Sequence, residues 1–286
     1  MTIKLLPPSV ILITGCSTGI GYQCAHQLHE MGYQVIATCR KPDDVERLIQ
    51  EGICCFQLDL VSSDSIQNAL TQVLQKSNGR IDALFNNGAF GLPGAVEDLS
   101  REAMEYQFQT NVFGTQELTN LVVPIMRRQG GGKIIYNSSI LGFAAMQYRG
   151  AYNASKFAIE GFADTLRLEV KKDNIQVSLI EPGPIISDFR KNAFSQFKQW
   201  ITVEESAHQE SYQAMISRLE TIGPSAPFTL EPEAVTKAVI HALQSKQAKI
   251  RYRVTVPTIV FSVLKRLLPN RLLDMLLIKA GGDGKR

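Results

Sequence analysis

A tyrosine and a lysine stand four positions apart in AYNASK, residues 151–156. The apolar residues that follow recur at helical spacing, so we expect a helix that continues to about Val170. Residues four apart share one face of a helix, which would place Tyr152 and Lys156 side by side. An ammonium group beside a phenol favours the phenolate, so we expect Lys156 to lower the pKa of Tyr152 and to make it useful in proton transfer. Taken alone, the pair also fits an ordinary helix surface, so the rest of the chain must decide.

A glycine-rich segment, TGCSTGIG at residues 14–21, follows the first apolar run and leads directly into a helical pattern. Gly15 allows a tight turn, Gly19 leaves room for a phosphate, and Gly21 lets the helix pack closely on the strand. The free N–H groups and the dipole of a helix N-terminus favour negative charge there. The segment therefore predicts a dinucleotide cofactor whose pyrophosphate lies at the start of this helix.

The residue after the second apolar run indicates which dinucleotide is used. Arg40 follows Gly21 by 19 residues, close to the offset at which an acidic side chain would bind the ribose of NAD. An arginine suits the 2′-phosphate of NADP instead. Asp43 and Asp44 come later and fit the first turn of the next helix, where acidic residues are favoured. We expect NADP(H), with NAD(H) as the alternative.

The elements that must position these residues alternate between short Val- and Ile-rich runs and helical patterns. Strands are expected at residues 10–14, 33–38, 53–59, 81–87, 133–139, 175–183 and 249–256. Helices are expected at about residues 20–31, 45–50, 65–75, 101–127, 151–170 and 232–243. This alternation predicts an α/β fold with a Rossmann-type, doubly wound parallel sheet of about seven strands and helices on both faces.

Two segments depart from the alternation, although residues 1–286 are expected to form a single domain. Residues 184–232 carry aromatic side chains among polar ones and predict a substrate lid. Four of these rings recur at intervals of three to five residues, so several of them could share one helix face and form an apolar lid over the site: Phe189, Phe194, Phe197 and Trp200. The alternative is that they pack inward. Residues 255–280 form an amphipathic, basic segment that is too short and too interrupted to span a bilayer. We favour a cover over the core or a subunit interface, with peripheral membrane contact as the alternative.

Composition excludes several classes of protein. With 44% hydrophobic and 20% charged residues the chain can build a full core, and its net charge of +3 is too small to argue for nucleic acid. The five cysteines show no zinc-binding spacing, so no metal site is expected. An odd cysteine count without a signal peptide favours free thiols and a cytoplasmic location.

Several motifs, among them TGCSTGIG, NNGA and AYNASK, resemble those of the short-chain dehydrogenase/reductase family and occur in the same order, over nearly the whole chain. In closer detail, segments such as CRKPDDVERL and SLIEPGPI resemble a bacterial subgroup of NADP-dependent aldehyde reductases, and they are similar to retinol and hydroxysteroid dehydrogenases as well. The resemblance implies a catalytic set of Asn111, Ser139, Tyr152 and Lys156, with Ser139 preceding Tyr152 by 13 residues. It implies cofactor contacts from Gly15, Ser17, Thr18, Gly19, Ile20, Gly21, Arg40, Asp59, Leu60, Asn87, Tyr152, Lys156, Pro182, Gly183 and Ile185.

The resemblance also implies a role for each catalytic residue. Tyr152 would give its proton to a substrate carbonyl oxygen, and Ser139 would hold that oxygen. Lys156 would bind the nicotinamide ribose, and Asn111 would support a water path to the lysine. The expected activity is NADPH-dependent reduction of an apolar aldehyde by a homodimer or homotetramer. A retinol- or steroid-type dehydrogenase, or a non-catalytic NADPH sensor, is the alternative.

One motif departs from the family pattern. Residues 86–89 read NNGA where the family usually has NNAG, so the flexible residue moves to position 88. This swap could alter the backbone after the fourth strand. Because Asn87 is in place, we expect cofactor binding to survive.

Overall fold

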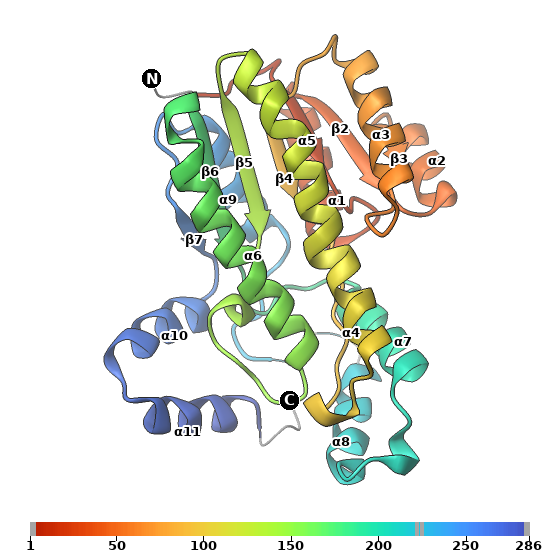
Figure 1. Ribbon diagram of the computed structural model, residues 1–286, viewed down its shortest axis with the longest axis vertical. Coiled ribbons are helices and arrows are strands. Elements are labelled where there is room, and N and C mark those ends of the chain that lie inside the picture. The colour runs from red at the N-terminus through yellow and green to blue at the C-terminus, as the bar shows by residue number, and fades with distance from the viewer. Residues whose placement is uncertain (1–3, 221–222, 224–225, 283–286) are drawn as a thin grey trace.

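The computed structural model describes residues 4–220, 223 and 226–282 (Figure 1). A seven-stranded parallel sheet lies at its centre, in the order β3-β2-β1-β4-β5-β6-β7. This confirms the predicted fold class. The strands are β1 Val10–Ile13, β2 Gln34–Cys39, β3 Cys54–Gln57, β4 Ala83–Asn86, β5 Gly132–Asn137, β6 Ile175–Glu181 and β7 Arg251–Arg253.

The strand order reverses between β1 and β4, and this reversal positions the site. Strands β1 to β3 extend toward one edge of the sheet, whereas β4 to β7 extend toward the other. Leu12 of β1 pairs with Ile36 of β2 on one side and with Leu84 of β4 on the other. The loops that leave β1 and β4 must diverge there, so a crevice opens at the carboxyl ends of the strands. The glycine-rich segment and Asn87 both follow strands that flank this point.

Helices cover both faces of the sheet, as the buried Val- and Ile-rich strands require. One face packs against α1 Gly19–Glu30, α2 Pro42–Gln50 and α9 Glu233–Gln244. The other face, toward the viewer in Figure 1, packs against α3 Ser63–Lys76, α5 Thr115–Arg128 and α6 Gly150–Glu169. Each helix contributes an apolar stripe to one of these two cores, such as Leu118 and Val122 from α5.

The long helix expected over residues 101–127 contains a local irregularity. It consists of α4 Arg101–Phe108, a π-helical turn at Gln109–Gly114, and α5. Such turns inside helices often occur at functional sites. Short 3₁₀ turns lie at Val96–Asp98, Ile140–Gly142, Lys171–Asp173 and Val203–Glu205.

Four further helices gather beyond the carboxyl ends of the strands (Figure 1). They are α7 Phe189–Trp200, α8 Gln209–Glu220, α10 Val256–Leu267 and α11 Asn270–Ala280. The last strand is shorter than predicted because the chain enters α10 at Val256, with Pro257 in its first turn. No helix in the described part of the chain is long and apolar enough to cross a membrane.

Candidate active site

A cavity of about 1170 Å³ opens at the carboxyl ends of the strands, between the sheet and the outer helices. It is larger than the roughly 300–1,000 Å³ typical of a single drug-sized ligand. The structure brings most of the predicted site residues to its wall: Gly15, Ser17, Thr18, Gly19, Ile20, Asn87, Ser139, Tyr152, Lys156, Pro182, Gly183 and Ile185.

The glycine-rich loop approaches its neighbours so closely that side chains would not fit. Gly15 and Gly19 have φ of +69° and +59°, which glycine adopts readily. A Cβ on Gly15 would lie 2.6 Å from the Cα of Gly88, and one on Gly19 would lie 2.9 Å from the Cβ of Ser187. The side chain of Thr18, which precedes α1, does not cap the helix. Backbone N–H groups of the first turn of α1 are therefore left to bind an anion in the cavity.

Five predicted site residues do not line the cavity, and Gly21 is one of them. A Cβ on Gly21 would lie 2.3 Å from the carbonyl oxygen of Gly15, so this glycine permits the close packing that its spacing predicted. The others are Arg40, Asp59, Leu60 and Asn111.

Three of the predicted residues that do not line the cavity follow β2 and β3: Arg40, Asp59 and Leu60. Arg40 is exposed, and its guanidinium donates a hydrogen bond to the Tyr106 hydroxyl at 3.4 Å. The Asp59 carboxylate accepts a hydrogen bond from the N–H of Val61 at 3.0 Å. Leu60 is buried and packs close to Gly88.

The NNGA segment keeps an ordinary backbone. Gly88 is not among the glycines with positive φ, so the moved glycine introduces no left-handed turn. The N–H groups of Asn87 and Gly88 both donate to the Thr14 hydroxyl, at 2.9 and 2.8 Å. The Asn87 side chain donates to the Gly15 carbonyl at 3.0 Å. The loop after β4 is thereby fixed to the glycine-rich loop.

Tyr152 and Lys156 lie on the same face of α6, and their pKa values differ from the expectation. Lys156 is 4% exposed, and its ammonium lies 5.6 Å from the centre of the Tyr152 ring and donates to the Asn137 carbonyl at 2.6 Å. Burial lowers the pKa of Lys156 to about 8, an effect that nearby Glu160 opposes.

Burial raises the pKa of Tyr152 well above its usual value, and a hydrogen bond with Ser139 offsets only part of that rise. The expectation of a lowered Tyr152 pKa is therefore wrong, because the effect of burial outweighs that of the neighbouring groups. The Lys156 ammonium donates to a backbone carbonyl, and burial disfavours the charged form of this lysine.

Ser139 and Asn111 are fixed by their local structure. The Ser139 hydroxyl accepts a hydrogen bond from the N–H of Leu141 at 3.1 Å, at the start of the turn after β5. Asn111 lies in the π-helical turn and is buried. Its side-chain amide donates to the Phe90 carbonyl at 2.9 Å and to the Ser155 hydroxyl at 3.1 Å. Asn111 thus contacts the residue beside Lys156.

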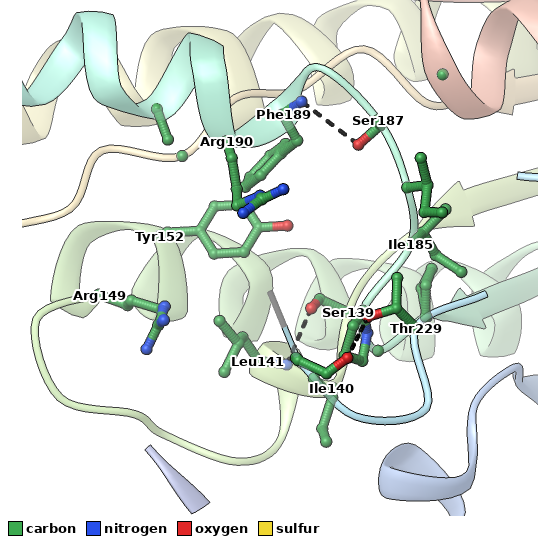
Figure 2. A pocket seen from close by; sticks show the side chains of 18 of the residues that line it. Ser139, Ile140, Leu141, Arg149, Tyr152, Ile185, Ser187, Phe189, Arg190 and Thr229 are labelled. Carbon is green, nitrogen blue, oxygen red and sulfur yellow. Dashed lines mark hydrogen bonds between the residues drawn. The ribbon is translucent and has the colours of Figure 1, made fainter. Parts of the chain in front are cut away.

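The predicted aromatic lid is only partly correct. Phe189 starts α7, and its ring centre lies 5.3 Å from that of Tyr152 (Figure 2). Phe194 also lines the cavity. Phe197 is 1% exposed and packs edge-on against Tyr212 at 5.2 Å.

Trp200 also lies away from the cavity, with its ring 5.8 Å from that of Tyr106. Of the four rings considered for the lid, Phe189 and Phe194 line the cavity, whereas Phe197 and Trp200 do not. These two rings join a small apolar core between α7, α8 and the segment before α4.

The sequence analysis missed two groups of cavity residues. An apolar group comes from the turn after β5 and from α10: Ile140, Leu141, Val256, Val260 and Phe261. A basic group consists of Arg149, Arg190 and Arg218, from three separate elements. The amphipathic pattern of residues 255–280 predicted a covering helix but not which surface it covers.

Comparison with known proteins decides the family. The model of the short chain dehydrogenase family matches residues 9–198. The chain belongs to the short-chain dehydrogenase family. It is 42% identical over 277 residues to "Uncharacterized oxidoreductase YbbO" of Escherichia coli K12, covering 97% of this chain and 96% of that protein. The predicted family resemblance is confirmed.

Relatives with more specific names are also similar to this short-chain dehydrogenase. It is 32% identical to "3-ketodihydrosphingosine reductase" of Bacteroides thetaiotaomicron, over 94% of this chain and 96% of that one. It is 38% identical to human "Retinol dehydrogenase 8", over 66% of this chain and 63% of the relative. A Burkholderia phymatum short-chain dehydrogenase solved with NAD has a TM-score of 0.76 at 21% identity, covering 93% of this chain and 94% of that one, which shows the shared fold.

Proposed function

We propose that the protein is an NADPH-dependent oxidoreductase that reduces the carbonyl group of an apolar aldehyde to an alcohol. One observation carries the proposal. Ser139, Tyr152 and Lys156 line the same cavity as the glycine-rich loop and the start of α1. A proton donor and a dinucleotide site would then lie within reach of one substrate, which is what carbonyl reduction needs.

The residues on the cavity wall fit a nicotinamide dinucleotide. The open N–H groups at the start of α1 suit its pyrophosphate, and Gly19 leaves space where a Cβ would meet Ser187. Lys156 would bind the nicotinamide ribose, and the backbone of Ile185 would hold the carboxamide. When bound, the cofactor supplies the hydride that goes to the carbonyl carbon.

Arg40 is the basis for proposing NADP(H) rather than NAD(H). Its guanidinium is exposed and makes one long hydrogen bond, to Tyr106, so it can turn toward a 2′-phosphate. Asp59 and Leu60 would border the adenine side of the cofactor.

Tyr152 would act as the proton donor. Because burial raises its pKa, the phenol holds its proton at neutral pH until negative charge develops on the substrate oxygen. Ser139 would donate a hydrogen bond to the same oxygen and fix its distance from Tyr152. The charge of Lys156 would favour the phenolate that remains, and Asn111 would help to return a proton through water.

The substrate end of the cavity supports an apolar compound. Phe189, Leu141 and Val260 lie on its wall, beyond the glycine-rich loop. A retinol- or steroid-type dehydrogenase is the second candidate, favoured by the similarity to retinol dehydrogenase 8. A sensor that binds NADPH without turnover is the third, and the complete set of Asn111, Ser139, Tyr152 and Lys156 argues against it.

We further propose that residues 1–286 act as one cytoplasmic unit that pairs through α4, α5 and α6. Phe113, Phe157, Phe162 and Leu168 are exposed along this face. Light scattering at micromolar protein should give a multiple of the 31.7 kDa chain mass, two or four chains. A single-chain mass would contradict the pairing. The exposed apolar side of α10 and α11, with Lys265 and Arg266 beside it, would be the place for peripheral membrane contact.

A screen of cofactor oxidation tests the proposed activity. Aliphatic aldehydes, retinal and ketosteroids should be offered with NADPH and, in parallel, with NADH. We expect aliphatic aldehydes to give the highest kcat/KM with NADPH, with the alcohol as product. Faster turnover of retinal or a ketosteroid would select the second candidate. NADPH binding without oxidation by any of these compounds would select the sensor.

A further inference from the structure

Three arginines from separate elements reach the substrate end of the cavity. Arg149 precedes α6, Arg190 lies in the first turn of α7, and Arg218 lies in the last turn of α8. Figure 2 shows Arg149 and Arg190 on different sides of the Tyr152 ring. Burial, with repulsion from Arg149 and Arg190, lowers the pKa of Arg218 to about 9. Arg149 and Arg190 are thus close enough to Arg218 to disfavour its charged form.

The Arg218 guanidinium has no hydrogen-bond acceptor among the residues that the structure describes. Its Nε is buried without a partner. Burying this N–H donor without an acceptor is costly, and the guanidinium carries four further N–H donors that a ligand could use. Arg190 differs, because it donates to the carbonyls of Arg218 and Gly223 and so closes the end of α8. Arg190 therefore has a structural role, whereas the Arg218 side chain has none that its contacts reveal.

Nearby carboxylates in the described part of the chain do not pair with Arg190 or Arg218. Asp188 and Glu220 also border the cavity, but both are exposed. Within the described ranges neither forms an ion pair with Arg190 or Arg218. A partly buried cation that lacks an anion is strongly destabilising unless a ligand supplies the opposite charge.

We propose that Arg218, with Arg190 and Arg149 around it, binds an anionic group at the far end of an amphipathic carbonyl substrate. The apolar wall formed by Phe189, Leu141 and Val260 would hold the chain between that anion and the carbonyl at Tyr152. Carboxylates and phosphates both match a guanidinium in charge and geometry. The inference rests on the proposed carbonyl reduction for the other end of the substrate, and it narrows the substrate class to apolar chains that carry a terminal anion.

Matched pairs of substrates test the proposal. The probes are ω-oxo acids from 6-oxohexanoate to 12-oxododecanoate, their uncharged methyl esters, and the corresponding ω-phosphates. At the chain length that fits, we expect kcat/KM for an anionic substrate to exceed that of the ester by about tenfold or more, typical of a charge-assisted hydrogen bond. Whether the acid or the phosphate gives the larger ratio identifies the anion. Equal values for charged and uncharged substrates at every length would overturn the proposal.

Variants of the arginine locate the effect. Arg218→Gln should abolish the preference for the anion and leave kcat/KM for the ester within about twofold, whereas Arg218→Lys should restore part of the preference. Arg128→Gln is the control, because Arg128 is exposed on α5 and far from the cavity wall. If Arg218→Gln kept the preference and instead weakened NADPH binding, the arginines would serve the cofactor and the proposal would be wrong.

A binding measurement separates this inference from the proposed activity. Calorimetry of the NADP-loaded protein with decanoate and with decanol needs no turnover. We expect decanoate to bind more tightly, and Arg218→Gln to remove that difference. If no aldehyde were reduced but decanoate still bound in this manner, the proposed function would fail and the anion site would stand. Decanoate binding no tighter than decanol would overturn the anion site alone.

Discussion

The two ends of the cavity are built in different ways. At the cofactor end, the glycine-rich loop and the loop after β4 approach closely at Gly15 and Gly88 and are joined by hydrogen bonds of Thr14 and Asn87. At the other end, helices α7, α8, α10 and α11 provide side chains such as Phe189 and Val260. Strand order and glycine spacing therefore determine where a cofactor can bind. The choice of substrate is determined by side chains on the outer helices, whose packing the strand pattern does not specify.

The supporting cores differ in the same way. The cofactor end rests on strands that are buried on both faces and on two large cores. The substrate end rests on two smaller clusters, one around Phe197 and Tyr212 and the other around Leu141 and Leu273. A change in a smaller cluster should therefore alter the substrate end without disturbing the cofactor end.

The largest expected effect comes from Tyr152→Phe, which keeps the ring and removes the proton. We expect kcat to fall by about 10²–10⁴-fold, the usual contribution of a positioned proton donor, while NADPH still binds. Stopped-flow reduction and fluorescence titration of NADPH measure the two quantities. Tyr33→Phe is the control, because the Tyr33 hydroxyl bonds to the Leu5 carbonyl away from the cavity. Substantial turnover by Tyr152→Phe would show that another group supplies the proton.

Two phenylalanines of α7 should separate stability from substrate selection. Phe197→Ala removes a fully buried ring and should lower the free energy of unfolding by about 3–5 kcal/mol. Phe189→Ala removes a ring that is 36% exposed, so its effect on unfolding should be much smaller. Denaturant melts measure both changes.

The selection of substrate should depend on Phe189, which lines the cavity, and not on Phe197, which does not. From propanal to decanal, kcat/KM of the unaltered protein should rise, because each buried methylene contributes about 0.8 kcal/mol. Phe189→Ala should flatten this rise. If kcat/KM of the unaltered protein did not change along the aldehyde series, the proposed apolar lid would be wrong.

Much of this architecture could be predicted from the sequence, and the reasons are physical. Buried parallel strands and the glycine spacing are local patterns, so the sheet was predicted correctly and the glycine-rich loop lies between β1 and α1 as expected. The aromatic lid was predicted only in part, because helical spacing does not tell which face of α7 meets the cavity. Phe197 and Trp200 turn toward neighbouring helices whose packing the pattern does not contain.

The sequence did not predict the grouping of the three arginines or the raised pKa of Tyr152. Arg149, Arg190 and Arg218 are far apart in the chain, and only the tertiary fold brings them to one cavity. The spacing of Tyr152 and Lys156 predicted their proximity, but the raised pKa of Tyr152 depends on burial by distant segments. Burial of that kind is not a property of local sequence.

A smaller effect is expected for the choice of cofactor. Arg40→Asp should lower kcat/KM with NADPH by about tenfold or more, because a carboxylate repels the 2′-phosphate, and should change NADH use less. Steady-state kinetics with both cofactors give the ratio. Lys41→Asp is the matched control, since it makes the same change of charge one residue later. An equal shift of the ratio in both variants would mean that Arg40 acts through general charge and not through a specific contact.

We propose that, within this one cavity, a hydride passes from NADPH to the carbonyl carbon of the substrate. Reduction of decanal with NADPH deuterated at the transferred position tests it most directly, with mass spectrometry of the alcohol. We expect one deuterium on the carbon that carried the carbonyl, and we expect the labelled alcohol to form at the rate of NADPH oxidation. In Tyr152→Phe its formation should slow to the same extent as kcat. NADPH oxidation that yields unlabelled alcohol, or no oxidation with any aldehyde, would contradict the account.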